Sequence, residues 1–323
     1  MQTTKDIPQW LASHHSDGVN LSIKELLYYR TKASLLNLSL GRPAQAKLAG
    51  GYLAKTKGRG MEFDEARHYQ PGDDIRAIDW RVTARTGKTH TKIYREEKER
   101  PVFVLADLSS SMHFGTQLLF KSVQVAHLTA LIAWAAHKRG DRIGGLIYNQ
   151  TQHKEFKPFS RQKAVLSLLN GIVNLHHPQS PPPKHGEEQV TFTDACARLR
   201  RLAHPGSLVF ILSDFANLTE SAQQHISQLS RHCEVTAYPI SDPFEHALPQ
   251  SKYQQMLNLT DGQDEQQILI GEQRIATQYQ SEHEQRFNAI NTRLKKCRVN
   301  VVPISCAQSL ERQLAKRSSE TAV

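Results

Sequence analysis

An unbroken apolar run, Val102-Phe103-Val104-Leu105-Ala106, limits the fold of this chain more than any other feature. A strand without polar alternate positions is typical of a parallel sheet whose two faces are both covered by helices. From this run to the C-terminus, strand-like and helix-like patterns alternate. The alternation predicts an α/β fold with a doubly wound, mostly parallel sheet of the Rossmann-like kind in residues 101–323.

Apolar runs and helical spacing predict the elements of this region. The predicted strands cover residues 102–106, 142–148, 154–156, 207–213, 234–240 and 298–304. The predicted helices cover residues 117–138, 161–175, 194–203, 219–230, 273–296 and 307–316. A polar, proline-rich loop is expected over 176–189, and residues 243–272 are interpreted as a possible insertion with a hairpin over 257–266.

Residues 1–100 are predicted to form a smaller region of one helix and short β-strands. Apolar residues recur at helical spacing over residues 22–40, and Ser22 with Glu25 three positions later matches a capping box. Residues 62–100 have the character of short strands, with turns at Pro71-Gly72 and Thr86-Gly87. We therefore expect a domain boundary near residue 100.

The charge balance indicates which partners suit the chain. Its 323 residues carry a formal net charge of +10, and residues 1–100 hold 18 Lys and Arg against 12 Asp and Glu. Such an excess favours acidic partners, but acids are interleaved throughout, and we favour the interpretation that this is a soluble surface with mixed charges. No apolar run reaches the length of a membrane span, and the N-terminus shows no secretory signal. We expect a cytoplasmic protein without a membrane span.

Oxygen-bearing side chains follow two of the predicted parallel strands. Asp107, Ser109 and Ser111 form the pattern D-x-S-x-S directly after strand 102–106, and Asp214 directly follows strand 207–213. A further hydroxyl, Thr193, ends the proline-rich loop. The carboxyl ends of parallel strands meet at one edge, and an all-oxygen set suits a hard cation such as Mg²⁺. Each residue alone could simply cap the helix that follows it.

In this order the five residues resemble the metal-ion-dependent adhesion site of von Willebrand factor A domains. The resemblance implies that Asp107, Ser109, Ser111, Thr193 and Asp214 hold magnesium or manganese. It also implies an open coordination position for an Asp or Glu carboxylate of a partner protein.

A second signature precedes this region and has the form R-x-Y-x-P-G-D-D-x-R-x-I-D-W, over residues 67–80. With Gly58, Gly60 and residues 83–85 it is similar to the signature of the bacterial family of unknown function numbered 58. Many members of that family carry N-terminal membrane helices, which this sequence lacks. The resemblance implies work beside a MoxR-type AAA+ ATPase in complex assembly.

The second signature contains the residues that we predict to contact a partner. These candidates are Arg67, Asp73, Asp74, Arg76, Asp79, Trp80 and Arg85. The alternative is a rigid turn and strand that serve only the fold, because Pro-Gly sets a turn and the two aspartates can bond its backbone.

Two functions remain after the motifs are compared with known catalytic patterns. The sequence holds no G-x-S-x-G and no complete phosphate-binding loop, so we find no catalytic set and expect a non-enzymatic interaction module. That module would bind a protein partner through its divalent cation. The alternative is a metal-dependent phosphoester hydrolase or a nucleic-acid-binding protein that uses the basic N-terminal region.

Overall fold

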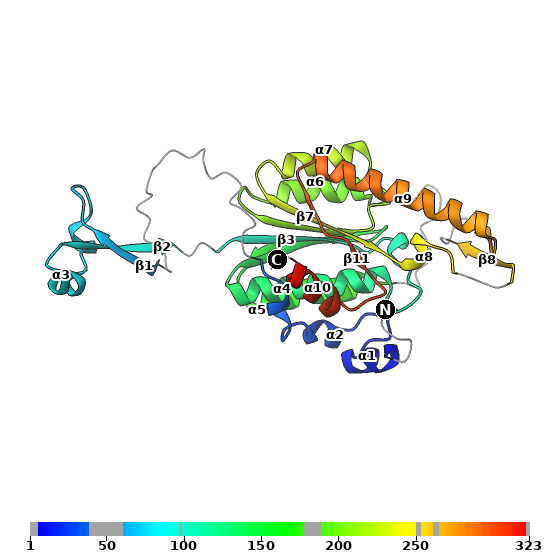
Figure 1. Ribbon diagram of the computed structural model, residues 1–323, viewed down its shortest axis with the longest axis horizontal. Coiled ribbons are helices and arrows are strands. Elements are labelled where there is room, and N and C mark those ends of the chain that lie inside the picture. Colours follow the sequence, from blue (N-terminus) through cyan, green and yellow to red (C-terminus); the bar gives the residue numbers. More distant parts are fainter. Residues whose placement is uncertain are drawn as a thin grey trace. The chain divides into compact units, whose positions relative to one another are not determined.

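The computed structural model describes residues 6–38, 61–96, 99–177, 189–249, 253–260 and 265–320. The chain divides into two compact units (Figure 1). The large unit comprises residues 1–40 and 100–323, and the small unit comprises residues 41–99. The expected boundary near residue 100 therefore lies where one unit ends, but residues 6–38 group with the large unit rather than with the small one.

The large unit is built on a mostly parallel sheet, as predicted. Its strand order is β10-β7-β6-β3-β4-β5, and β11 also pairs with β7. All pairs are parallel except β4 with β5. The strands are β3 (Pro101–Asp107), β4 (Arg142–Tyr148), β5 (His153–Phe159), β6 (Leu208–Ser213), β7 (Glu234–Ser241), β10 (Asn300–Val301) and β11 (Ile304–Ser305).

Helices cover both faces of this sheet (Figure 1). On one face, Val102, Val104 and Ala106 of β3 pack with α4 (Lys121–Arg139) and α5 (Gln162–Leu175). On the other face, Phe103 and Leu105 pack with α6 (Phe192–Leu202), α7 (Glu220–Leu229) and the end of α9 (Gln273–Lys296). Two apolar layers explain why the strand sequence shows no polar alternation. Across the part of the chain that the structure describes, no helix combines the length and apolar character needed to cross a membrane.

The N-terminal segment packs on α4. Its elements are α1 (Ile7–His14), α2 (Ile23–Tyr28) and the short 3₁₀ turn η1 (Ala33–Leu35). The predicted capping box of Ser22 and Glu25 is present, but the predicted helix over 22–40 ends at Tyr28. The Trp134 indole donates to the Leu26 carbonyl over 3.3 Å, and Tyr29 is completely buried. Packing on α4 therefore overrides the helical spacing after residue 28.

The small unit contains an antiparallel pair, β1 (Met61–His68) with β2 (His90–Glu96), as the strand pattern predicted. Between them lie the 3₁₀ turn η3 (Ile75–Ala77) and helix α3 (Trp80–Thr86), which the sequence reading did not predict. The Asp79 carboxylate accepts hydrogen bonds from the backbone N–H groups of Arg81 and Val82, and so caps α3. Gly87, at φ +70°, ends the helix at the predicted turn.

The described parts of residues 243–272 form short elements that are not strands of the main sheet. They are α8 (Pro243–His246) and the antiparallel hairpin β8 (Gln255–Thr260) with β9 (Glu265–Ile270), so the predicted hairpin is confirmed. Its Asp261-Gly262 turn lies outside the described residues, as does loop 178–188. The predicted strand 298–304 is two short strands, because Pro303 lacks an N–H for continuous pairing. The chain's last described helix is α10 (Leu310–Glu320).

Candidate functional site

Three neighbouring parallel strands end in or just before an aspartate. Asp107 is the last residue of β3, Asp214 directly follows β6, and Asp242 directly follows β7. The register pairs Ala106 with Leu212 and Ser213 with Pro239, so the three strands end at nearly the same level. The carboxyl edge of the sheet, where α/β folds place their ligands, therefore carries the candidate site.

Asp107 is buried at this edge of the sheet, with 2% of its surface exposed. One carboxylate oxygen accepts from the Ser109 backbone N–H over 3.0 Å, and the other accepts from the Ser213 hydroxyl over 2.6 Å. Burial raises the pKa of Asp107, and the negative charge of Asp214 raises it further. A bound cation would relieve both effects, because it favours the ionised carboxylate.

The predicted hydroxyls line one pocket of about 350 Å³. Ser109 Oγ lies 3.4 Å from Ser111 Oγ on one wall. Thr193 Oγ1 lies 2.8 Å from Thr219 Oγ1 on another. Tyr148 also lines the pocket. The structure thus brings the D-x-S-x-S turn and Thr193 to a common space, although 82 positions separate Ser111 from Thr193.

Thr193 does not cap the helix that contains it. The cap of α6 is Thr191, whose hydroxyl accepts from the Asp194 N–H over 3.1 Å, while the Asp194 carboxylate accepts from the Thr191 N–H. This reciprocal pair satisfies the helix terminus two residues before Thr193. The Thr193 hydroxyl is therefore not used at its own helix end, and it is hydrogen-bonded to the Thr219 hydroxyl on the wall of the pocket.

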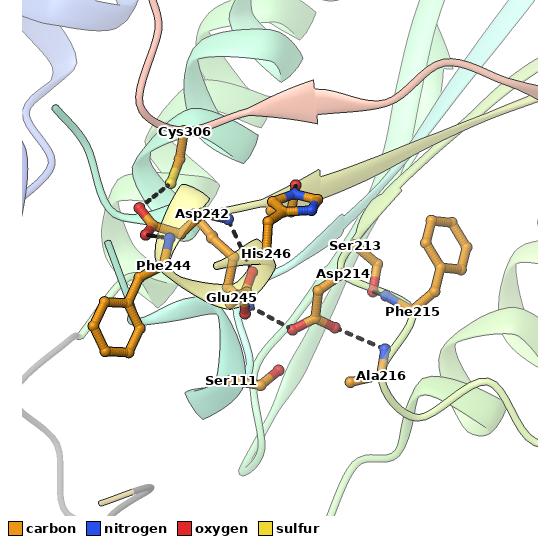
Figure 2. Close-up of polar contacts among 12 residues, drawn as sticks. Ser111, Ser213, Asp214, Phe215, Ala216, Asp242, Phe244, Glu245, His246 and Cys306 are labelled. Carbon is orange, nitrogen blue, oxygen red and sulfur yellow. Dashed lines mark hydrogen bonds and ion pairs between the residues drawn. The ribbon is translucent and has the colours of Figure 1, made fainter. Parts of the chain in front are cut away.

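Asp214 stands apart from the residues that line the pocket and is paired with a lysine. Lys121 Nζ lies 3.0 Å from Asp214 Oδ2, and the Ala216 N–H donates to Asp214 Oδ1 over 3.0 Å. In Figure 2 the Ser111 hydroxyl is directed toward the Asp214 carboxylate. The second carboxylate of the predicted set is thus present at the edge, with part of its charge already compensated.

The same lysine binds a carboxylate that the sequence reading did not include. Lys121 Nζ lies 2.7 Å from Glu245 Oε1, and the lysine side chain is 2% exposed. Burial alone would lower the pKa of Lys121, but the charges of Asp214 and Glu245 raise it above its usual value. Lys121 is therefore a permanent positive charge beside the candidate site.

The donor set fits a small hard cation. Within the described ranges, no three His, Cys, Asp or Glu side chains gather in a way that could hold a metal ion. A metal here would therefore depend on the hydroxyls of Ser109, Ser111 and Thr193, which line the pocket. Asp107 is not among the lining residues, and its buried carboxylate is joined to the pocket wall through the Ser109 N–H. Oxygen donors with few carboxylates are the set that Mg²⁺ accepts while it retains several waters.

Sequence reasoning missed four residues of this edge: Lys121, Ser213, Asp242 and Glu245. The rule that ligands gather at strand ends could have identified Asp242, because this residue lies two positions after the predicted strand 234–240. Its buried carboxylate accepts from the Thr116 N–H and hydroxyl and from the Phe244 N–H, so it joins two loops. Lys121 gave no signal, because a lysine in the first turn of a helix is ordinarily solvated.

In the small unit, most of the predicted partner residues serve the fold. Arg67 pairs with Asp73 at 2.7 Å. Asp74 caps η3 through the Arg76 N–H, and Asp79 caps α3. The other three candidates are exposed: Arg76, Trp80 and Arg85. The Trp80 side chain is 68% exposed, so these three remain available for contact with another molecule.

Comparisons with known proteins place this chain among uncharacterised relatives. The family model described as "Protein of unknown function DUF58" matches residues 65–289. Uncharacterized proteins of Mycobacterium tuberculosis and Mycobacterium bovis are each 30% identical over 214 residues. That match covers 66% of this chain and 65% of each relative, so the chain spans about two thirds of their length.

A solved structure is also similar in part. It is the conserved hypothetical protein BatB from Bacteroides thetaiotaomicron, with 12% identity and a TM-score of 0.40. The similarity covers 69% of this chain and 98% of that one.

Proposed function

This chain belongs to the DUF58 family of proteins of unknown function, and we propose that it is a non-enzymatic interaction module that depends on a divalent metal. Magnesium or manganese would be held by Ser109, Ser111 and Thr193, with Asp107 and Asp214 supplying charge. The resemblance to von Willebrand factor A domains supports this assignment, because the ordered five-residue pattern is the adhesion-site pattern.

The observation that carries the proposal is the hydroxyl-lined pocket, one of whose residues, Ser109, donates its N–H to the buried Asp107 carboxylate. Neutral hydroxyls leave most of the charge of a divalent cation uncompensated, so the cation would attract a carboxylate strongly. An Asp or Glu side chain of a partner protein is the simplest source of that carboxylate. The pocket is open and about 350 Å³ in volume, which accommodates such a side chain.

The residues around the pocket favour binding over hydrolysis. They are hydroxyls, amides and apolar groups, and none of the residues that the structure places around it is Asp, Glu, His, Lys or Arg. Tyr148 also lines the pocket, but burial raises the pKa of its phenol well above the ordinary value, which makes it a poor base. A phosphoester hydrolase needs a general acid or base within hydrogen-bond reach of its substrate. The donor set therefore supports capture of a carboxylate more than the alternative enzymatic function.

We infer the partner from the family resemblance and from the small unit. The resemblance to the DUF58 signature makes a MoxR-type AAA+ ATPase the partner that we propose, with this chain as its adaptor or assembly factor. Arg76, Trp80 and Arg85 are exposed and give the small unit a second contact surface suited to an acidic protein face. We propose a cytoplasmic location for this chain.

The test is Asp107→Ala, measured by calorimetry with Mn²⁺ and by pull-down in Mg²⁺ or chelator. We expect the variant to lose Mn²⁺ binding and Mg²⁺-dependent partner capture while circular dichroism shows a retained fold. Glu284→Ala on α9 is a matched control, because that carboxylate is exposed. Equal Mn²⁺ affinity before and after the Asp107 change would contradict the proposal, and Mg²⁺-dependent turnover of a simple phosphodiester would favour the alternative.

A further inference from the structure

Lys121 connects two carboxylates that come from different elements. It is the first residue of α4, and its ammonium lies 3.0 Å from Asp214 after β6 and 2.7 Å from Glu245 on α8. Only Asp214 belongs to the five-residue pattern. The lysine is almost completely buried and Asp214 is 11% exposed, so water screens this contact less than it would at the surface, whereas the Glu245 side chain is 30% exposed.

Glu245 is held in place by the short helix that carries it. Its Oε1 contacts Lys121, while its Oε2 accepts from the Asp242 N–H over 2.9 Å. The Asp242 carboxylate accepts from the Phe244 N–H and from Cys306 Sγ, as Figure 2 shows. These bonds hold the Glu245 carboxylate against the Lys121 ammonium. The position of α8 therefore determines how much of the lysine charge Glu245 neutralises.

Helix α9 packs against the other side of α8. The His246 ring lies 4.2 Å from the His283 ring, measured between centroids, and His246 Nε2 lies 2.8 Å from Ser241 Oγ. Glu245 and His246 are thus adjacent residues of α8, of which one contacts Lys121 and the other contacts α9. A change in the packing of α9 on α8 would alter the contact between Glu245 and Lys121.

We propose that Lys121 is a positioning residue that regulates metal binding at this edge, an inference that rests on the proposed function. Its positive charge opposes a divalent cation and compensates Asp214. Glu245 weakens this repulsion, because its carboxylate neutralises part of the positive charge of the ammonium group. The more of the Lys121 charge that Glu245 neutralises, the more negative charge Asp214 keeps to attract the metal.

The experiment is a double-mutant cycle in the full chain, with Mn²⁺ affinity measured by calorimetry. Lys121→Met should bind Mn²⁺ at least tenfold more tightly, because the opposing charge is gone. Glu245→Gln should bind at least threefold more weakly, and its amide oxygen can still accept from the Asp242 N–H. If Glu245 acts through Lys121, adding Glu245→Gln to Lys121→Met should change the affinity by less than twofold.

The control is Lys138→Met, an exposed lysine on the same helix, which should bind as the unaltered chain does. Thermal melts establish that each variant is folded, and Lys121→Gln replaces Lys121→Met if the latter unfolds. Unchanged affinity in the Lys121 variant overturns the inference while the proposed metal site stands. Equal weakening by Glu245→Gln in both backgrounds also overturns it, and absence of Mn²⁺ binding in the unaltered chain removes both proposals.

Discussion

Replacement of Ser213 by alanine should destabilise the large unit more than any other loss of a single hydroxyl oxygen at this edge. The Ser213 hydroxyl donates to Asp107 Oδ2 over 2.6 Å and accepts from the Phe215 N–H over 3.0 Å. Both contacts are buried, and Ser213 is 1% exposed. Phe215 has a φ of +58°, a left-handed conformation that is uncommon for a residue other than glycine.

The magnitude follows from these two contacts. A hydrogen bond to a charged group contributes about 1.5–3 kcal/mol, and a buried N–H left without a partner costs about 1–3 kcal/mol. The two effects are not independent, because Phe215 and Asp107 can both shift when the hydroxyl is absent. We therefore expect the free energy of unfolding to fall by about 2–4 kcal/mol.

The assay is urea unfolding followed by circular dichroism, with the slope of the transition compared between variants. Loss of the hydroxyl should also raise the pKa of Asp107 further, since the Ser213 bond opposes the effect of burial. The matched control, Ser221→Ala, removes an exposed hydroxyl and should change stability by less than about 0.5 kcal/mol. A loss below 1 kcal/mol in Ser213→Ala at an unchanged slope would refute the reasoning.

Three further measurements test other parts of the molecule. Asp79→Ala should destabilise the small unit by about 1 kcal/mol through loss of the α3 cap, whereas Trp80→Ala should leave its unfolding midpoint nearly unchanged because the indole is 68% exposed. Burial lowers the pKa of His113 and of His176 to about 4 from 6.5. The unfolded chain therefore binds more protons between those values, and stability should fall as pH falls from about 6.5 to 4; a flat urea midpoint over this range would contradict it. Saturation with Mn²⁺ at 100 times its dissociation constant should stabilise the large unit by about 2.7 kcal/mol, and a chelator should reverse the shift in melting temperature.

The amino-acid order was sufficient to predict features that depend on neighbours along the chain. The apolar run over 102–106 and the alternation after it identified the mostly parallel sheet, because covered strands need apolar residues on both faces. The Ser22–Glu25 capping box is equally local, since both partners lie within one helical turn. Placing Asp107 and Asp214 at one edge followed from the direction of parallel strands, a rule of topology rather than of contact.

Other features arise from contacts between residues that are distant in the chain. The helical spacing after Tyr28 was overridden by packing on α4, and this packing assigned residues 6–38 to the large unit. Glu245 meets Lys121 across 124 positions, and no periodicity or cap relates them. Whether a charged side chain is buried, and which opposite charge compensates it, depends on how layers pack, so local pattern cannot specify it. The charges around the metal site that we propose are therefore a product of the folded packing. Of the proposed ligands, Ser109 and Ser111 follow β3 directly, whereas Thr193 lies at the start of α6 and reaches the pocket only through the fold.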